Sequence, residues 1–371
     1  MKGKTISILL ILTLSQNAYS QCESISVQTV SNFTPLPIDS LFESDGLRDG
    51  PDYLGATLYY PLNGKSNLKS IVLVPGFRAT QESVSKWARY FAARGFICMT
   101  IGTNSIYQLP NLRALALLDG IKSIRTENNR VNSPLYQHID TSNISVGGWS
   151  MGGGGAELAA KMDSTIESII VFTPWLNPAT LIQSDLDHSV PVLIFSGQFD
   201  QVAPPFQHAD LHYDYTPSST HKLLFEISGG DHYNVLNPNT VNGDIGNVAY
   251  AWLTLYADNN PCYCNMLLTD SLNQNSTAST YQTNLSCPTL SIANKEYSDL
   301  KTKIIPNPAT GYFQVEFSES HNIEYIIHDS FGQKVKRGNI SSGDMINIDG
   351  LPSGIYFLNL GQQEGLKIVI Q

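Results

Sequence analysis

The chain has 371 residues, enough for two or three domains of ordinary size. Apolar residues make up 42% and charged residues 15%, a balance that suits a sizeable core and excludes a disordered chain. With 22 basic against 32 acidic residues the net charge is −10, which argues against a nucleic-acid partner because that needs a basic surface. Beyond the first twenty positions no apolar run reaches the length of a bilayer, so we expect no stable membrane span.

The N-terminus has the pattern of a cleaved export signal. Two lysines precede a short apolar stretch, and residues 18–20 (Ala-Tyr-Ser) fit a small-x-small cleavage site. We therefore expect residues 1–20 to be a signal peptide and the mature chain to be secreted. A lipid anchor on Cys22 is the less favoured alternative, because the residue before it is not small. Export leads to an oxidising compartment, where cysteines form disulfides.

From about residue 22 to 260 the chain alternates apolar strands with helix-like stretches, which is typical of an α/β protein with a mainly parallel sheet covered on both faces. In chain order, the predicted elements are strand Leu68–Val74, helix Ser83–Arg94, strand Phe96–Ile101, helix Leu112–Arg125, strand Ile144–Gly147, helix Gly152–Met162, strands Ile166–Phe172, Val190–Phe195 and Lys222–Ile227, and helix Val248–Tyr256.

The composition changes after Asp258. Residues 259–300 are rich in Asn, Ser and Thr, whereas residues 301–371 contain short alternating strands separated by turn residues, typical of a small all-β sandwich. We therefore predict a catalytic domain over 21–290, a linker over 291–300 and a second domain over 301–371. The strands predicted in the second domain are Phe313–Phe317, Tyr325–His328, Met345–Ile348 and Ile355–Leu360.

A candidate nucleophile lies between a predicted strand and a predicted helix. Residues 148–152 read Gly-Trp-Ser-Met-Gly and match G-x-S-x-G, the sharp turn that lifts a serine hydroxyl out of a sheet. The helix start after Ser150 offers backbone N–H groups to a developing oxyanion, and the first of these belongs to Met151. A second donor should come from a loop after an early strand, and the N–H of Phe77 fits.

A serine needs a general base and a group that orients the base. In this chain order an acid and then a histidine should each follow a later strand, which selects Asp200 and His232. Asp231 adjoins His232, but sequence neighbours on a loop rarely orient each other's rings. The other candidates are Asp185, Asp187, Asp210 and Asp214 for the acid and His188, His208, His212 and His221 for the base, of which His212 and His221 read as solvated surface residues.

The five cysteines divide into two groups. Cys98 lies in a predicted central strand and is expected to be a buried free thiol. The other four, Cys22, Cys262, Cys264 and Cys287, allow three pairings. We expect neither a metal site nor a cofactor, because no matching His or Cys pair accompanies the C-x-C spacing of Cys262 and Cys264.

Residues from about 53 to 258 resemble polyester hydrolases of the α/β-hydrolase superfamily, on the cutinase and dienelactone-hydrolase side, and bacterial poly(ethylene terephthalate) (PET) hydrolases in particular. The motifs that carry the resemblance are Pro75-Gly76-Phe77, the run from Gly148 to Gly154, Thr173-Pro174-Trp175, the stretch from Asp200 to Pro204, and Gly229-Gly230-Asp231-His232. The resemblance implies an α/β-hydrolase fold, with Ser150 as nucleophile, His232 as base, Asp200 as orienting acid, and Phe77 and Met151 as oxyanion donors.

The resemblance also implies substrate contacts, with aromatic walls at Phe77, Trp149 and Trp175. Trp149 stands where most cutinase-type members carry His, and dedicated PET hydrolases share this Trp. His208 stands beneath Trp175 where those dedicated enzymes have a small Ser, so PET activity is expected to be weak. The family's disulfide near the active site is absent, because Gly197 and Asn234 occupy the matching places.

The resemblance bears on the C-terminal end of the catalytic domain and on the tail. The family ties that end with one bridge, which implies that Cys287 pairs with Cys264 or Cys262, leaving the other for Cys22. Residues 301–371 resemble the C-terminal sorting domains of type IX secretion cargo, on the motifs Ile305-Pro306-Asn307-Pro308, Phe331-Gly332, the run from Leu351 to Tyr356, and Lys367. The secretion machinery is the partner that this resemblance implies.

The sequence therefore predicts a secreted, monomeric carboxylic-ester hydrolase that acts on polyesters, aromatic ones in particular, through a Ser-His-Asp acyl-enzyme mechanism. The alternative is a general short-chain esterase, cutinase or lipase with only incidental PET activity. A lipase would need a long apolar lid, and no insertion of that kind separates the predicted strands.

Overall fold

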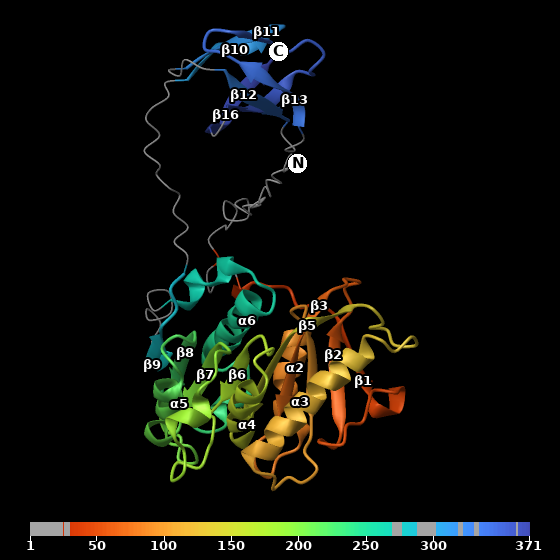
Figure 1. The fold of residues 1–371 in the computed structure, drawn as a ribbon, viewed down its shortest axis with the longest axis vertical. Helices are drawn as coiled ribbons and strands as arrows, with labels where there is room; N and C mark the ends of the chain where they lie inside the picture. The colour runs from red at the N-terminus through yellow and green to blue at the C-terminus, as the bar shows by residue number, and fades with distance from the viewer. Residues whose placement is uncertain are drawn as a thin grey trace, which may run out of the picture. The chain divides into compact units, whose positions relative to one another are not determined.

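The structure is a computed structural model that describes residues 25, 30–268, 277–287, 302–317, 322–329, 334–360 and 363–371. The predicted signal peptide (1–20) and linker (291–300) lie outside the described residues. The chain divides into two compact units, Met1–Pro288 and Thr289–Gln371, and each is described by itself. Figure 1 shows the first unit as a sheet with helices and the second as an all-β unit.

The first unit is built on a nine-stranded sheet in the order β1-β2-β4-β3-β5-β6-β7-β8-β9. In Figure 1 this sheet runs from β1 on the right to β9 on the left. The strands are β1 (Ile38–Phe42), β2 (Ala56–Pro61), β3 (Leu68–Val74), β4 (Ile97–Ile101), β5 (Ile139–Trp149), β6 (Ile169–Phe172), β7 (Val192–Gly197), β8 (Lys222–Ile227) and β9 (Ala278–Thr283). The strands from β4 to β8 pair in parallel, as the alternation predicts.

The edges of this sheet were not predicted. On one side β1 and β2 add antiparallel strands, and on the other β9 pairs antiparallel with β8. β9 comes from the segment rich in Asn, Ser and Thr, where only one of its six residues is buried. An edge strand that is half exposed lacks the apolar pattern of a central strand, and the composition of this segment therefore conceals it.

Helices cover both faces. They are α2 (Ser85–Ala92), α3 (Pro110–Glu127), α4 (Met151–Met162), α5 (Ala209–Tyr215) and α6 (Asp244–Tyr256). Side chains along β3 point alternately to the two faces of the sheet. Ile71 and Leu73 pack on one face in a buried cluster that also contains Trp87 of α2 and Trp252 of α6. The neighbouring β3 residues pack into a second cluster with α3, α4 and α5. This doubly covered sheet is the α/β architecture that the sequence predicts.

Short 3-10 helices and one disulfide complete the first unit. The 3-10 helices are Glu43–Asp45, Gln81–Val84, Gln183–Leu186, Pro205–Gln207, Asn234–Leu236, Val241–Gly243, Pro261–Tyr263 and Asn265–Leu267. Cys264 is bonded to Cys287 across a sequence separation of 23 residues. Cys262 is also disulfide-bonded, and Cys22, its predicted candidate partner, lies outside the described residues. Cys98 is a buried free thiol.

The second unit is all-β. Its strands are β10 (Lys303–Thr310), β11 (Tyr312–Glu316), β12 (Ile323–His328), β13 (Lys334–Ile340), β14 (Met345–Asn347), β15 (Gly354–Leu360) and β16 (Gln363–Ile370). They pair in the order β13-β12-β15-β16-β10-β11-β14, antiparallel except for the contact of β10 with β16. Alternate residues such as Phe313, Val315 and Leu358 fill a core of its own. In the described part of the chain, no helix has the length and apolar character needed to cross a membrane.

Candidate active site

Ser150 lies on a strained turn between β5 and α4. Its backbone has φ 56° and ψ −121°, in the left-handed half of the map that a non-glycine residue rarely adopts. The flanking glycines allow the helix to approach the strand: a Cβ on Gly148 would lie 2.4 Å from the Gly152 carbonyl, and one on Gly152 would lie 2.5 Å from the Pro75 oxygen. The Ser150 side chain does not cap α4, which leaves its hydroxyl available.

The loop after β3 lies directly against this turn. A Cβ on Gly76 would lie 2.9 Å from Ser150 Cβ and 2.9 Å from the Trp149 ring, so only glycine fits here. Gly76 is followed by Phe77, the predicted oxyanion donor, and Ser150 is followed by Met151 at the N-terminus of α4. Within the described residues, neither N–H donates a hydrogen bond to a backbone carbonyl. The oxyanion roles expected of these two N–H groups stay predictions.

Asp200 and His232 meet at the same edge of the sheet. Asp200 follows β7 and His232 follows β8, and His232 Nδ1 lies 2.6 Å from Asp200 Oδ2. The other carboxylate oxygen of Asp200 accepts the N–H groups of Val202 (2.7 Å) and Ala203 (2.8 Å). Burial raises the pKa of Asp200, but the hydrogen bonds from His232, Ala203 and Val202 outweigh it and hold that pKa below its usual value. The carboxylate thus stays ionised and orients the imidazole.

The His232 backbone is fixed from the nucleophile's side. The Trp149 indole N–H donates to the His232 carbonyl at 3.0 Å, and the two rings lie 5.3 Å apart. Because Trp149 directly precedes Ser150, this contact places the His232 loop against the turn that carries the serine. The loops after β7 and β8 also contact each other, since a Cβ on Gly197 would lie 2.5 Å from the Asp231 carbonyl.

The competing candidates are engaged elsewhere. The Asp231 carboxylate accepts the N–H groups of Tyr233 and Asn234, so it stabilises a turn rather than the ring of His232. The Asp185 carboxylate accepts the N–H of Ile182 in a short turn. His221 is exposed, as predicted, and its Nδ1 contacts the Tyr256 hydroxyl at 2.8 Å.

The prediction that His212 is a solvated surface residue is wrong. His212 is completely buried, and its Nδ1 lies 3.3 Å from Glu157 of α4. His188 Nε2 contacts the other oxygen of the same carboxylate at 2.7 Å. The error arises because α5, the helix that turns His212 inward, was not predicted. Glu157, His188 and His212 thus form a cluster in the interior of the first unit, not at its surface.

Four exposed or half-exposed aromatic side chains belong to loops that contact the Ser150 turn, the Phe77 ring or His232, and we call them the aromatic rim: Phe77, Tyr107, Trp175 and Tyr233. Phe77 is 43% exposed and meets Tyr107 edge to face at 5.6 Å. Tyr233 is 58% exposed and contacts the Trp149 and His232 rings at 5.6 Å. Trp149 itself is only 7% exposed, so it supports the rim from beneath. Tyr107 and Tyr233 were not predicted as part of the aromatic rim; for Tyr233, its position beside His232 was the available signal.

Trp175 lies between His208 and an apolar hollow. The Trp175 and His208 rings stack at 5.9 Å with an interplanar angle of 29°, and His208 is buried. Burial, with repulsion from His212, lowers the pKa of His208 to about 4, so this imidazole is neutral at pH 7. A hollow of about 350 Å³ adjoins Trp175 and is lined mainly by Leu109, Pro110, Leu158, Leu176 and Leu181. Asn111, Asn177, Thr180 and Asp185 complete its lining.

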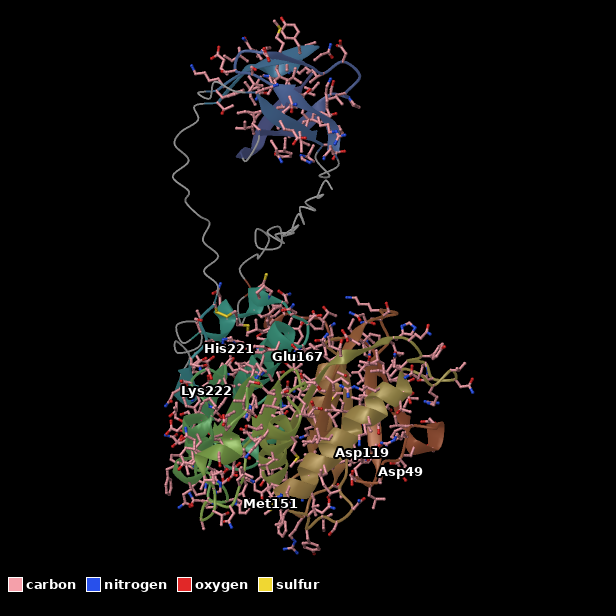
Figure 2. The ribbon with its side chains drawn as sticks, in the orientation of Figure 1. Asp49, Asp119, Met151, Glu167, His221 and Lys222 are labelled. Carbon is pink, nitrogen blue, oxygen red and sulfur yellow. A yellow bond between two sulfur atoms is a disulfide. The ribbon has the colours of Figure 1, made fainter. Side chains whose placement is uncertain are left out.

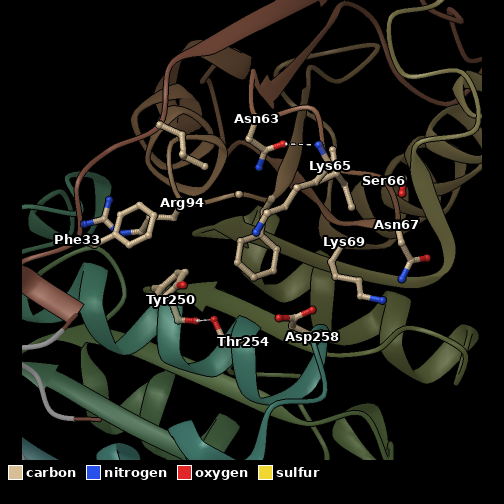
Figure 3. A pocket seen from close by; sticks show the side chains of 14 residues that line it. Phe33, Asn63, Lys65, Ser66, Asn67, Lys69, Arg94, Tyr250, Thr254 and Asp258 are labelled. Atoms are coloured by element: carbon tan, nitrogen blue, oxygen red, sulfur yellow. Dashed lines mark hydrogen bonds between the residues drawn. The ribbon is translucent and has the colours of Figure 1, made fainter. Parts of the chain in front are cut away.

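A second hollow, of about 470 Å³, lies away from Ser150 at the amino ends of β3 and β4. Figure 3 shows Arg94, Lys65, Lys69, Tyr250 and Asp258 around it. Its lining combines the cations of Lys65, Lys69 and Arg94 with the carboxylate of Asp258. In Figure 2, Met151 at the start of α4 lies near the lower end of the first unit, and Lys222 at the start of β8 lies higher on its left side. Among the described residues, no group of His, Cys, Asp and Glu could hold a metal ion.

The sheet order, the strained serine turn after β5 and the Asp–His pair after β7 and β8 define an α/β-hydrolase. More particularly, the chain belongs to the PET hydrolase-like family, whose model matches residues 43–288. It is a carboxylic ester hydrolase. Residues 303–371 match the secretion system C-terminal sorting domain.

Similar proteins agree with this assignment. The chain is 32% identical over 229 residues to Cutinase est1 of Thermobifida alba. The matched stretch covers 62% of this chain and 74% of that protein. It is 32% identical over 229 residues to Cutinase 2 of Thermobifida cellulosilytica, covering 62% and 83%. It is also 32% identical over 210 residues to the bis(hydroxyethyl) terephthalate hydrolase of Streptomyces coelicolor, covering 56% of this chain and 64% of that protein.

Proposed function

We propose that this protein is a secreted polyester hydrolase that cleaves ester bonds through Ser150, His232 and Asp200. The observation that carries the proposal is the buried contact of His232 with Asp200, at the edge of the sheet where the strained Ser150 turn also lies. A serine, an oriented imidazole and two free N–H groups are the parts that acyl transfer requires. Family membership and the three cutinase or terephthalate-ester relatives support the same chemistry.

In the proposed acylation step, Ser150 Oγ attacks the ester carbonyl carbon while His232 Nε2 takes the hydroxyl proton. The resulting oxyanion accepts hydrogen bonds from the N–H groups of Phe77 and Met151. The carbon–oxygen bond to the alcohol then breaks, and His232 returns its proton to the departing oxygen. Asp200 stabilises the imidazolium that exists between these two transfers.

Deacylation repeats the same transfers with water. His232 removes a proton from water, and the hydroxide attacks the acyl carbon attached to Ser150. The second oxyanion uses the same two N–H groups, and collapse releases the carboxylic acid as Ser150 recovers its proton from His232. Each oxyanion-hole donor is worth about 10²–10³-fold in rate in enzymes of this type.

The aromatic rim supports a substrate with aromatic or extended apolar units. Ring stacking adds about 0.5–1.5 kcal/mol per pair beyond burial of area. Phe77 and Trp175 flank the nucleophile. Gly76, the residue before Phe77, lies against Ser150, and the backbone N–H of Trp175 donates to the Ser150 carbonyl at 2.9 Å. An exposed surface rather than a deep cavity suits a polymer chain that must be reached at a solid face.

A second candidate function is a cutinase-like or short-chain esterase with only incidental action on PET. The stack of His208 on Trp175 favours it, because a buried imidazole on one face of the indole restricts how the indole tilts. The two functions share the catalytic residues and differ in substrate preference.

We further propose that the C-terminal unit directs this chain through type IX secretion, so that the enzyme acts outside the cell or at its surface. The match of residues 303–371 to a secretion sorting domain supports this. Deleting these residues should retain the enzyme inside the cell without reducing ester cleavage by the purified first unit; loss of cleavage would contradict a sorting role.

The direct test compares wild type with Ser150→Ala on p-nitrophenyl butyrate. The variant should lose about 10⁵-fold or more of kcat, because the residual rate comes from binding and the oxyanion donors alone. Equal rates would overturn the proposal. Release of terephthalate products from amorphous PET film, measured beside an aliphatic polyester, then separates the two candidate functions.

A further inference from the structure

Arg113 is a fully buried arginine close to the proposed oxyanion hole. It lies in the first turn of α3, and its relative exposure is 0%. Its neighbour across the helix interface is Gly155 of α4, where a Cβ would lie 2.8 Å from Arg113 Cβ. The side chain is therefore enclosed between α3 and α4, beneath the loops that follow β3 and β4.

All three arms of its guanidinium donate to backbone carbonyls of those loops. Nη1 donates to Pro75 at 2.8 Å, Nε to Gln108 at 3.0 Å and Nη2 to Ile106 at 3.2 Å. Pro75 is two residues before Phe77, and residues 106 and 108 flank Tyr107. One side chain thus ties the loop of the oxyanion donor to the loop that packs on it.

Two of the carbonyls that Arg113 binds, those of Ile106 and Pro75, also contact residues next to Phe77 and Ser150. The Ile106 oxygen also accepts the N–H of Arg78, the residue after Phe77, at 2.8 Å. The Pro75 oxygen faces Gly152, where a Cβ would come within 2.5 Å. Phe77 is therefore held on both sides, by the Pro75 contact before it and the Ile106 contact after it, while its ring packs on Tyr107.

A charge in this place carries costs of its own. Among the described residues, no carboxylate pairs with Arg113, and burial lowers its pKa to about 10, which leaves it charged at neutral pH. A positive charge in the first turn of a helix also opposes the helix dipole. An apolar side chain of similar volume would avoid these costs, but it would leave three carbonyl oxygens without their Arg113 donor. The fork of donors supplies what an apolar residue cannot, namely fixed positions for three carbonyls.

We propose that Arg113 is a positioning residue for the oxyanion hole, holding the Phe77 N–H and the Phe77–Tyr107 wall in their working geometry. The inference rests on the proposed function, since it assumes that Phe77 donates to the oxyanion. Arg113 does not touch the substrate. Because oxyanion donors act on the transition state more than on bound substrate, loss of the clamp should lower kcat and leave KM nearly unchanged.

The test measures kcat and KM on p-nitrophenyl butyrate for Arg113→Ala and Arg113→Lys, per folded enzyme as judged by circular dichroism. We expect kcat to fall about 100-fold in Arg113→Ala and about tenfold in Arg113→Lys, with KM within about threefold of wild type. Lysine keeps the charge but not the three-armed fork. If the alanine variant does not fold, the lysine variant carries the test.

Arg48→Ala is the matched control. Arg48 also binds α3, through Asp119 (2.8 Å) and Ser123 (2.7 Å), but two to three turns further along the helix. It should lower stability and leave kcat unchanged. A second measurement adds millimolar guanidinium to Arg113→Ala, where it should restore part of kcat; it should restore none in Gly76→Ala, which distorts the same loop without making a cavity.

A kcat within about twofold of wild type in both Arg113 variants overturns the clamp, and so does a loss confined to KM or a folded alanine variant that guanidinium does not rescue. Ser150→Ala is measured in parallel. If that variant is inactive while the Arg113 variants are normal, only the clamp fails. If Ser150→Ala is fully active, the proposed function itself fails.

Discussion

His232 Nδ1 lies 2.6 Å from Asp200 Oδ2, and the two side chains are 4% and 0% exposed. They come from loops after adjacent parallel strands, β7 and β8, whose carboxyl ends meet at one edge of the sheet. Asp200 also accepts two backbone N–H groups, which hold its carboxylate in place independently of His232. Because an ionised carboxylate can only accept, the contact favours the tautomer with its proton on Nδ1 and holds the imidazole in one orientation.

Asp200→Asn should preserve the fold and remove the orienting charge. We expect kcat to fall by about 10⁴-fold, as happens when the acid of such a triad becomes an amide. The measurement is kcat on p-nitrophenyl butyrate with circular dichroism as the folding control; an amide variant with wild-type kcat would exclude Asp200 from the site.

The hydrogen bonds to Asp200 lower its pKa, so they also link stability to pH. The contribution of Asp200 to the free energy of unfolding is present above the carboxyl's unfolded pKa and is lost as the pH falls through its folded pKa.

Gly76→Ala should disable the site through backbone geometry alone. The added methyl would lie 2.9 Å from Ser150 Cβ and 3.1 Å from the Trp149 carbonyl, so the loop that carries the Phe77 N–H must move. A displaced donor costs about 10²–10³-fold in kcat. Gly354→Ala is the control, because its methyl would have no neighbour closer than 3.7 Å. Equal kcat values for the two variants would mean that the Phe77 N–H is not an oxyanion donor.

Glu157→Gln tests the buried cluster with His188 and His212. Burial raises the pKa of Glu157, but hydrogen bonds from both histidines outweigh it and lower that pKa to about 2. The carboxylate therefore contributes stability above its ordinary, unfolded pKa of 4.5, and it loses that contribution as the pH falls from there toward 2. Removing one partner of a buried charged group costs about 3 kcal/mol, so the variant should be less stable at pH 7.

Urea unfolding followed by tryptophan fluorescence measures this effect. Four tryptophans occur in the chain, and all precede residue 253, so their signal reports on the first unit. The difference in unfolding free energy between wild type and Glu157→Gln should shrink as the pH is lowered from 5 to 3. A difference that grows in acid would reverse the assigned sign.

His208→Ser tests what limits action on an aromatic polymer. It removes the ring stacked beneath Trp175 and leaves the proposed catalytic residues untouched. Product release from amorphous PET film should rise, whereas kcat on p-nitrophenyl butyrate should stay near wild type because a small ester does not need the indole to tilt. Unchanged or lower release from film would show that His208 does not restrain Trp175 in a way that matters.

The parts of the site that depend on local pattern were predictable from sequence. Gly148 and Gly152 around Ser150 specify a close approach of strand and helix, and the structure has that approach. The positions of Asp200 and His232 a few residues after strands predicted that their loops would meet, and they do. Their catalytic roles stay predictions.

The parts that depend on tertiary packing were not predictable. From its sequence neighbours His212 is predicted to be exposed. It is buried because the packing of α5 on α4 brings it to Glu157, 55 positions away in the sequence. The sequence shows Arg113 only as a cation on a predicted amphipathic helix. Its burial and its contacts could not be predicted, because its acceptors are backbone carbonyls, which every residue has. β9 was missed because an edge strand needs few apolar residues.

The most direct test of the central claim is covalent trapping of the nucleophile. The full-length protein is incubated with a fluorophosphonate ester, which forms a stable tetrahedral adduct with an activated serine, and peptides are mapped by mass spectrometry. The account predicts one adduct per chain, on Ser150, with loss of ester cleavage in proportion to labelling and no adduct in Ser150→Ala. Full labelling at another residue, or full activity with Ser150 modified, would contradict it.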